Sequence, residues 1–127
     1  NLFGDILCAM GELMAKKPEM KQDALYQLLR EGQIEEFNRR KQAGESCDLT
    51  DADLRGVDLR GLDADGLDLH GSYFRQSDLR GVDFRGANLE GASINGCKIS
   101  GAYFPDALWA DEITLSLTHG TRMRYRK

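Results

Sequence analysis

Side chains with the chemistry for catalysis or metal binding are few and widely separated in this chain of 127 residues. The only histidines are His70 and His119, and neither has a nucleophile pattern beside it. The cysteines Cys8, Cys47 and Cys97 lack the CxxC or Cys/His spacing of a metal site. No glycine-rich phosphate-binding motif occurs. The sequence therefore predicts a protein that is not an enzyme and that uses no cofactor or metal.

A five-residue period runs from Cys47 to Asp111 in thirteen consecutive blocks. The third residue is large and apolar in every block except the one that contains Ala64, and the first residue is mostly small and uncharged. The fifth residue is glycine in nine blocks. Within each block, side chains that alternate between the inside and the outside explain the order of apolar and polar residues. Because this alternation starts again every five residues, the backbone must turn a corner at the end of each block, and glycine permits such a turn. The chain is therefore expected to stack on itself as a solenoid.

The blocks, among them ADLRG, VDLRG and ANLEG, resemble the A(D/N)LXX motif of the pentapeptide-repeat family. The resemblance implies an all-β solenoid, a right-handed quadrilateral β-helix with twenty residues to a coil and about three coils. Residues twenty apart would then stack in buried ladders. The expected ladders are Leu49-Leu69-Leu89-Trp109, Leu54-Phe74-Ile94, Leu59-Leu79-Ile99 and Ala64-Phe84-Phe104. Because Ala64 is small and its neighbours Leu62 and Leu67 are large for their column, we expect these positions to exchange volume.

Outward positions of the repeat hold the candidate partner-binding residues. In the family geometry, Asp58, Arg60, Asp78 and Arg80 form a checkerboard of charges on one side of the column. The candidate face consists of these residues together with two further arginines, Arg55 and Arg75. The same charges also fit a ladder that only keeps the column soluble. Tyr73 and Tyr103 are expected to point outward on opposite sides, so they would not form one aromatic patch.

Residues 1–46 change to helical spacing and are expected to form an α-helical segment before the repeat at 47–111. Helices are predicted at 2–14, 19–31 and 33–43. The third would cover the open first coil, because an uncovered edge can pair with another molecule. The first is apolar enough to predict a homodimer formed through the N-terminal helices.

Residues 112–127 are expected to form a C-terminal cap and a basic tail. An acidic first turn and Gly120 favour a short helix over residues 112–118, docked on the last coil with Trp109 beneath it. The alternation of Ile113, Leu115 and Leu117 fits a strand equally well. The basic residues after it are expected to form a solvated chain end.

Charge argues against direct binding of nucleic acid. Lys and Arg number 7 against 8 Asp and Glu in residues 1–46, 6 against 12 in the repeats and 4 against 1 in residues 112–127, for a net charge of −4. No apolar run is long enough to span a membrane, and no secretory signal is recognisable. The cysteines Cys47 and Cys97 lie ten blocks apart, on opposite sides of the expected column, so they are interpreted as unpaired core residues. These features predict a cytoplasmic protein without membrane contact.

Two classes of function fit these observations. The first is a non-catalytic interaction or scaffold module that presents a rigid surface to a protein partner. The second follows from the resemblance, because some pentapeptide-repeat proteins act as DNA mimics that bind DNA gyrase or topoisomerase through an acidic, elongated dimer. The acidic repeats favour this alternative, whereas the short column and the outward arginines oppose it. A third hypothesis is that the chain is a domain of a larger protein.

Overall fold

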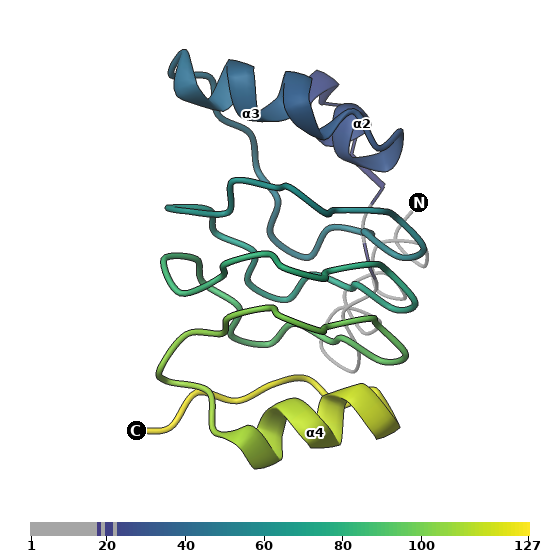
Figure 1. Cartoon of the computed structure of the whole chain (residues 1–127), viewed down its shortest axis with the longest axis vertical. Helices are drawn as coiled ribbons and strands as arrows, with labels where there is room; N and C mark the ends of the chain where they lie inside the picture. Colours follow the sequence, from purple (N-terminus) through teal and green to yellow (C-terminus); the bar gives the residue numbers. More distant parts are fainter. Residues whose placement is uncertain (1–17, 19, 22) are drawn as a thin grey trace, which may run out of the picture.

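The computed structural model describes residues 18, 20, 21 and 23–127, which form a stack of coils between two helical caps (Figure 1). The helices are α2 (Ala24–Arg30), α3 (Ile34–Gln42) and α4 (Ala110–His119). The predicted helix at 2–14 lies outside the described residues. Asp23 caps α2 by accepting hydrogen bonds from the backbone of Leu25 and Tyr26, so that helix begins later than the predicted residue 19. None of these helices, which have at most ten residues, is long and apolar enough to cross a membrane.

Turns and isolated bridges, rather than strands, hold the repeat together. Every bridge in the described residues is parallel and joins residues twenty apart, as in Asp53–Tyr73 and Tyr73–Ser93. A turn hydrogen bond recurs every five residues, for example from Leu62 N to Leu59 O and from Leu67 N to Ala64 O. The predicted coil of twenty residues with four corners is therefore present. The expectation of an all-β architecture is met only in part, because no strand is assigned in the described part of the chain.

The interior of the stack is built from the predicted ladders. Leu54, Phe74 and Ile94 are each 0% exposed, and the rings of Phe74 and Phe84 lie 6.3 Å apart between centroids. Ala64 and Leu62 are buried, and Leu67 packs against the core, as the exchange of volume requires. The stack therefore buries one continuous apolar column.

Small polar residues in the first column bond to the coil above. The hydroxyls of Ser72 and Ser77 donate to the carbonyl oxygens of Leu49 and Leu54 at 2.6 and 2.5 Å. The Cys97 thiol donates to Phe74 O at 2.7 Å. These residues are buried, so their hydrogen bonds offset the cost of removing polar groups from water.

Trp109 departs from its predicted ladder and is not buried beneath the C-terminal helix. Its side chain is 57% exposed, whereas its neighbour Leu108 is 6% exposed. The reason is that the chain leaves the coil here: Trp109 takes extended dihedral angles as the N-cap of α4, and the helix follows at once. The predicted helix at 112–118 is confirmed; it runs from Ala110 to His119 and is capped by Gly120 in the left-handed conformation.

The N-terminal helices close the first coil through side chains that bond to its free backbone edge. The Tyr26 hydroxyl donates to Asp53 O at 2.6 Å, and the Arg30 guanidinium donates to Arg55 O at 2.6 Å. Asn38 donates to Gly61 O and accepts from Asp63 N, both at 2.9 Å. The predicted capping role of the third helix is thus confirmed.

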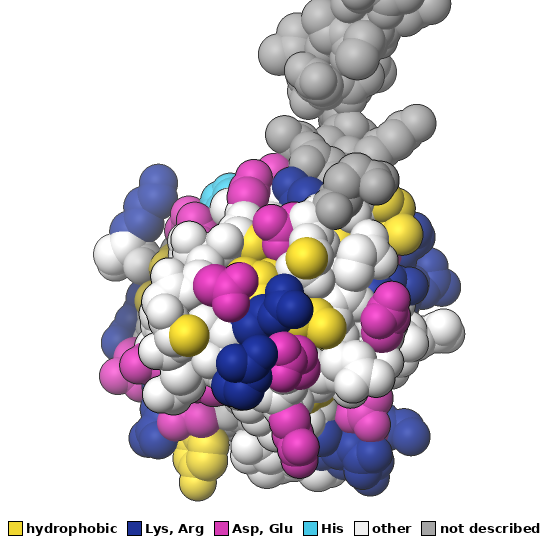
Figure 2. All heavy atoms as spheres, turned by 90° about the horizontal axis from the view of Figure 1, so that it is seen from above, with side chains coloured by type: hydrophobic (Ala, Val, Ile, Leu, Met, Phe, Trp, Pro, Cys, Tyr) yellow, Lys and Arg dark blue, Asp and Glu magenta, His cyan; other side chains and the backbone are white. Residues whose placement is uncertain are grey.

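Figure 2 looks onto the outer surface of this cap, where charged side chains of both signs intermingle and hydrophobic ones are small and scattered. Glu36 of α3 lies within 2.6 Å of Arg39 and within 3.1 Å of Arg40. The predicted homodimer contact involves residues 2–14, which are outside the described part of the chain.

The C-terminal segment closes the last coil in a different way. Residues 120–125 run opposite to residues 89–95: Ser93 donates to Gly120 O, while Tyr125 accepts from Leu89 N at 2.8 Å. Between them, Met123 N donates to Ala92 O and Met123 O accepts from Gly91 N. Met123 is 0% exposed, so the backbone of the tail is a packed part of the cap. The basic side chains of Arg124, Arg126 and Lys127 are exposed, as predicted for a solvated chain end.

Candidate interaction surface

The four corners of each coil give the stack four sides, which carry different charges. We name them by the residues of the first two coils: side 1 is 47–51 and 67–71, side 2 is 52–56 and 72–76, side 3 is 57–61 and 77–81, and side 4 is 62–66 and 82–86. The third coil continues each side in steps of twenty residues. The predicted candidate face falls on two adjacent sides, with Arg55 and Arg75 on side 2 and the checkerboard on side 3.

The checkerboard on side 3 is present as an ordered network of ion pairs. Asp58 and Asp78 are bridged in register. Each binds the arginine two residues later in a bidentate pair, with Oδ2–Nη2 distances of 2.7 Å to Arg60 and to Arg80. Arg60 also reaches Asp78 of the next coil at 3.5 Å. The arginine heads are therefore held in fixed positions on the surface.

The spacing itself explains this geometry. The carboxylate of each aspartate also accepts from the backbone N–H two residues later, at 3.1 Å in Arg60 and 3.2 Å in Arg80. The side chain of the arginine two residues later therefore begins beside the carboxylate that it binds. Asp53 and Arg55 on side 2 repeat the pair at 2.8 Å, although Asp53 is buried whereas Asp58 is exposed.

Two exposed cations on these sides make no ion pair with any residue that the structure describes. Arg75 has Tyr73 at the position where other blocks carry aspartate, so its block supplies no carboxylate. Lys98 follows Asp78 in the same outward column. Lys98 is absent from the predicted face, yet the twenty-residue period that placed Asp58 above Asp78 also identifies it.

The sides differ sharply in net charge. Sides 2 and 3 carry five cations and three carboxylates, which are Arg55, Arg60, Arg75, Arg80 and Lys98 against Asp53, Asp58 and Asp78. Sides 1 and 4 carry one cation and eight carboxylates, which are Arg85 against Asp48, Asp51, Asp63, Asp65, Asp68, Asp83, Glu90 and Asp106. The repeat is acidic as a whole, but its candidate face is locally basic.

The turn between α2 and α3 extends the candidate face. A pocket of about 300 Å³ is lined by residues 32–35 of this turn and by Asp58 and Arg60 of side 3.

Tyr73 and Tyr103 lie on sides 2 and 4, as predicted. Each has an arginine over its ring, Arg122 at 4.7 Å from the ring of Tyr73 and Arg85 at 4.5 Å from the ring of Tyr103. The aromatic residues therefore belong to separate surfaces.

The ion pairs should be visible as acid titrations. Hydrogen bonds from Arg80 lower the pKa of Asp78 to about 2, and those from Arg85 lower the pKa of Asp83 to about 2. Since an unfolded aspartate titrates near 3.9, these pairs stabilise the fold fully above about pH 4 and lose that effect as the pH falls towards 2. We expect ¹³C NMR titration to show both carboxylates still ionised at pH 3. An Arg80→Ala variant should raise the pKa of Asp78, and an Asp78 that titrates near 4 in the unaltered chain would contradict the pairing.

The residues with potential reactive chemistry remain apart. Burial raises the pKa of Cys47 and of Cys97 to about 11, and both are free thiols. His70 and His119 are exposed, on side 1 and at the end of α4. No group of three or more potential metal ligands occurs in the described part of the chain.

A stack of short coils that exposes a different charge pattern on each side is a repeat solenoid, a class whose long surfaces serve in recognition. A scan against protein families matches residues 45–85 and 68–106 to pentapeptide repeats, in 8 copies. The repeat region of this chain therefore belongs to the pentapeptide-repeat family. Searches of curated proteins and of solved structures found no match.

Proposed function

We propose that the chain is a non-catalytic interaction module that recognises an acidic segment of a protein partner through sides 2 and 3. The observation that carries the proposal is the pairing pattern on these sides. Arg55, Arg60 and Arg80 are held by neighbouring carboxylates, whereas the exposed Arg75 and Lys98 make no ion pair with the described residues. A partner carboxylate would gain the attraction of these two cations without breaking an existing pair.

The rigid setting of the arginines supports recognition rather than solubility alone. A bidentate pair fixes the guanidinium plane, so less side-chain freedom is lost when a partner binds. The remaining N–H donors of each guanidinium stay available at the surface because the carboxylate uses only one edge. Sides 2 and 3 thus offer fixed donors beside Arg75 and Lys98.

Capture from a bacterial lysate with three baits tests the proposal. The baits are the unaltered chain, an Arg75→Glu/Lys98→Glu variant, and an Arg126→Glu/Lys127→Glu variant that makes the same change in net charge at another place. All four residues are exposed, so the variants should unfold within about 0.5 kcal/mol of the unaltered chain. We expect proteins captured by the unaltered chain to be lost only from the first variant. Equal capture by all three baits would refute the role of sides 2 and 3.

A second candidate is supported by the opposite half of the stack. Sides 1 and 4 carry eight carboxylates against one arginine, a distribution that suits a DNA-mimic modulator of DNA gyrase or topoisomerase. In this case, the lysate experiment would enrich gyrase with the unaltered chain and with Arg75→Glu/Lys98→Glu. The enrichment would weaken in an Asp65→Asn/Asp68→Asn/Glu90→Gln variant, which removes three of the eight carboxylates on these sides.

We also propose that the stack has the right-handed quadrilateral form implied by the family, that the protein works in the cytoplasm, and that it forms a homodimer through residues 2–14. The apolar helical spacing of that segment supports the dimer. Light scattering of a chain without residues 1–17 tests it, since an unchanged oligomeric state would refute the contact.

A further inference from the structure

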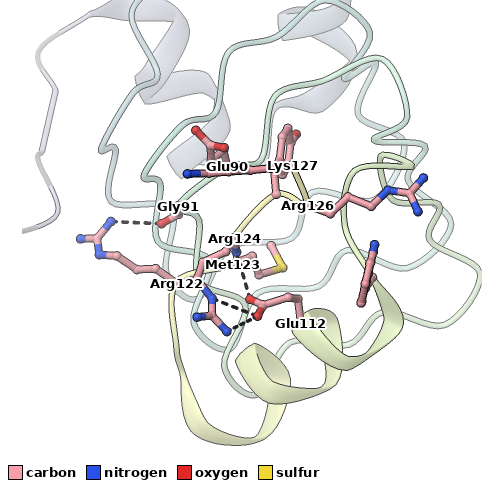
Figure 3. Close-up of a pocket in the computed structure, with 10 residues that line it drawn as sticks. Glu90, Gly91, Glu112, Arg122, Met123, Arg124, Arg126 and Lys127 are labelled. Carbon is pink, nitrogen blue, oxygen red and sulfur yellow. Dashed lines mark hydrogen bonds and ion pairs between the residues drawn. The ribbon is translucent and has the colours of Figure 1, made fainter.

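A pocket of about 650 Å³ opens at the C-terminal end of the stack, where the last coil continues side 1 (Figure 3). Its walls come from the last coil at Glu90 and Gly91, from the start of α4 at Trp109 and Glu112, and from the tail at residues 122–127. Its size lies within the range of small-molecule sites, roughly 300–1,000 Å³. Its wall is mostly apolar, as is typical of such sites.

The wall formed by the tail is held in place before any ligand arrives. Arg126 N donates to Ala107 O at 2.9 Å, and the buried Met123 is paired to the last coil. The guanidinium of Arg124 donates to Glu112 at 2.5 and 3.0 Å, and Glu112 also accepts from Arg124 N. The pocket is therefore preformed, which lowers the entropic cost of binding.

Trp109 supplies a broad aromatic surface at this pocket. It is 57% exposed although it is the largest apolar side chain in the protein, because the chain leaves the coil at this residue. An exposed indole beside a preformed pocket can stack against a planar ring, as aromatic side chains stack on bases in nucleic-acid-binding proteins. The apolar part of a ligand would therefore include a flat ring.

The charges around the pocket favour an anion. Four cations and two carboxylates line it, Arg122, Arg124, Arg126 and Lys127 against Glu90 and Glu112. Arg124 is neutralised by Glu112, and Arg122 points away from the pocket towards Gly91 O (Figure 3). Arg126 and Lys127 are exposed and form no ion pair with the described residues. Among the lining side chains without an ion pair to the described residues, there are thus two cations and one carboxylate, Glu90.

We propose that this pocket binds a small aromatic anion, whose planar ring stacks on Trp109 and whose phosphate or carboxylate group is held by Arg126. Lys127 points to the other side of the pocket (Figure 3) and adds to the attraction only through its charge. The site is independent of the partner face on sides 2 and 3. Charge complementarity sets the sign of the ligand, and the indole sets its shape. An uncharged ring would lose the attraction of the cations, and an anion without a ring would lose the stacking on Trp109.

Fluorescence gives a direct test because Trp109 is the single tryptophan of the chain. The unaltered full chain is titrated with adenosine monophosphate and with nicotinate, which join a ring to a phosphate or to a carboxylate. Adenosine and inorganic phosphate serve as the half-ligands. We expect saturable quenching by at least one aromatic anion, with an affinity at least tenfold higher than that of either half-ligand.

Variants then test the residues. Arg126→Glu/Lys127→Glu should weaken binding at least tenfold, whereas Arg75→Glu/Lys98→Glu should leave it unchanged. Unchanged thermal unfolding would show that the first variant is folded, and Lys127→Gln serves as a milder change if it is not. The proposal is overturned if neither aromatic anion gives saturable quenching at millimolar concentration, or if the folded Arg126→Glu/Lys127→Glu variant binds as the unaltered chain does. Loss of the lysate partners with intact binding here would separate this site from the partner face.

Discussion

Replacement of Phe84 by alanine is expected to lower the free energy of unfolding by about 3–5 kcal/mol. Phe84 is 0% exposed and lies in the middle coil, with its ring centroid 6.3 Å from that of Phe74 and 6.2 Å from that of Phe104. The substitution removes one ring contact within the middle coil, to Phe74, and one to the next coil, to Phe104. Since each coil of a solenoid is stabilised mainly by its neighbours, a cavity in the middle coil weakens both interfaces.

Urea denaturation followed by circular dichroism measures the effect. Phe84→Leu keeps most of the volume and should cost less than about 1.5 kcal/mol. Tyr103→Ala is the surface control on the same side, where the exposed ring contacts Arg85, and should cost less than about 1 kcal/mol. If Phe84→Ala cost no more than the surface control, the buried ladder would not be the main source of stability.

Replacement of Ser116 by alanine is expected to lower the free energy of unfolding by about 1–3 kcal/mol, because it leaves two backbone groups without partners. The Ser116 hydroxyl, at 0% exposure, accepts from Ile94 N at 3.0 Å and donates to Thr121 O at 2.6 Å. One side chain thus joins α4 to the last coil and to the tail. Its loss should loosen the C-terminal cap in particular.

Amide hydrogen exchange distinguishes this local effect from a general one. In Ser116→Ala, the amides of Gly91, Ile94 and Met123 should exchange faster, while those of the first coil keep the protection set by the remaining stability. Thr118→Ala is the matched control on the same helix, since the exposed Thr118 hydroxyl bonds only within α4, and should change stability by about 0.5 kcal/mol or less. Equal exchange in the two variants would show that the Ser116 bridge is unimportant.

The five-residue period was sufficient to predict the interior of the stack. It placed Leu54, Phe74 and Ile94 in one buried column because each pairing depends only on a fixed separation along the chain. The same argument failed for Trp109, where the blocks continue in the sequence after the backbone has left the coil. Periodicity predicts which residues share a column, but the energy of the cap decides where the column ends.

The caps themselves rest on contacts that no local pattern reveals. Asn38, Ser116 and Met123 bond to backbone groups more than twenty residues away, and nothing in their neighbourhood distinguishes them from ordinary polar or apolar residues. The pocket at Trp109 was missed for the same reason, since it forms only when the tail folds back. The paired charges of side 3 were predictable because each pair lies within one block.

The basic character of sides 2 and 3 was within reach of the sequence. Counting charges over the whole repeat gives an acidic stack, whereas counting every twentieth residue separates the two halves. Lys98 would have joined the candidate face by this count.

The two caps bond to particular sides of the stack, and this limits how the repeat can change in length. The N-terminal cap holds Asp53 and Arg55 on side 2, and the C-terminal cap holds Gly91 and Ile94 on sides 1 and 2. Insertion of twenty residues would add one coil and leave both caps over the same sides. Insertion of five would rotate one end by a quarter turn relative to the other and misplace every one of these bonds. Insertions and deletions in the repeat region are therefore expected to comprise whole coils of twenty residues, although the sequence repeat is only five residues long.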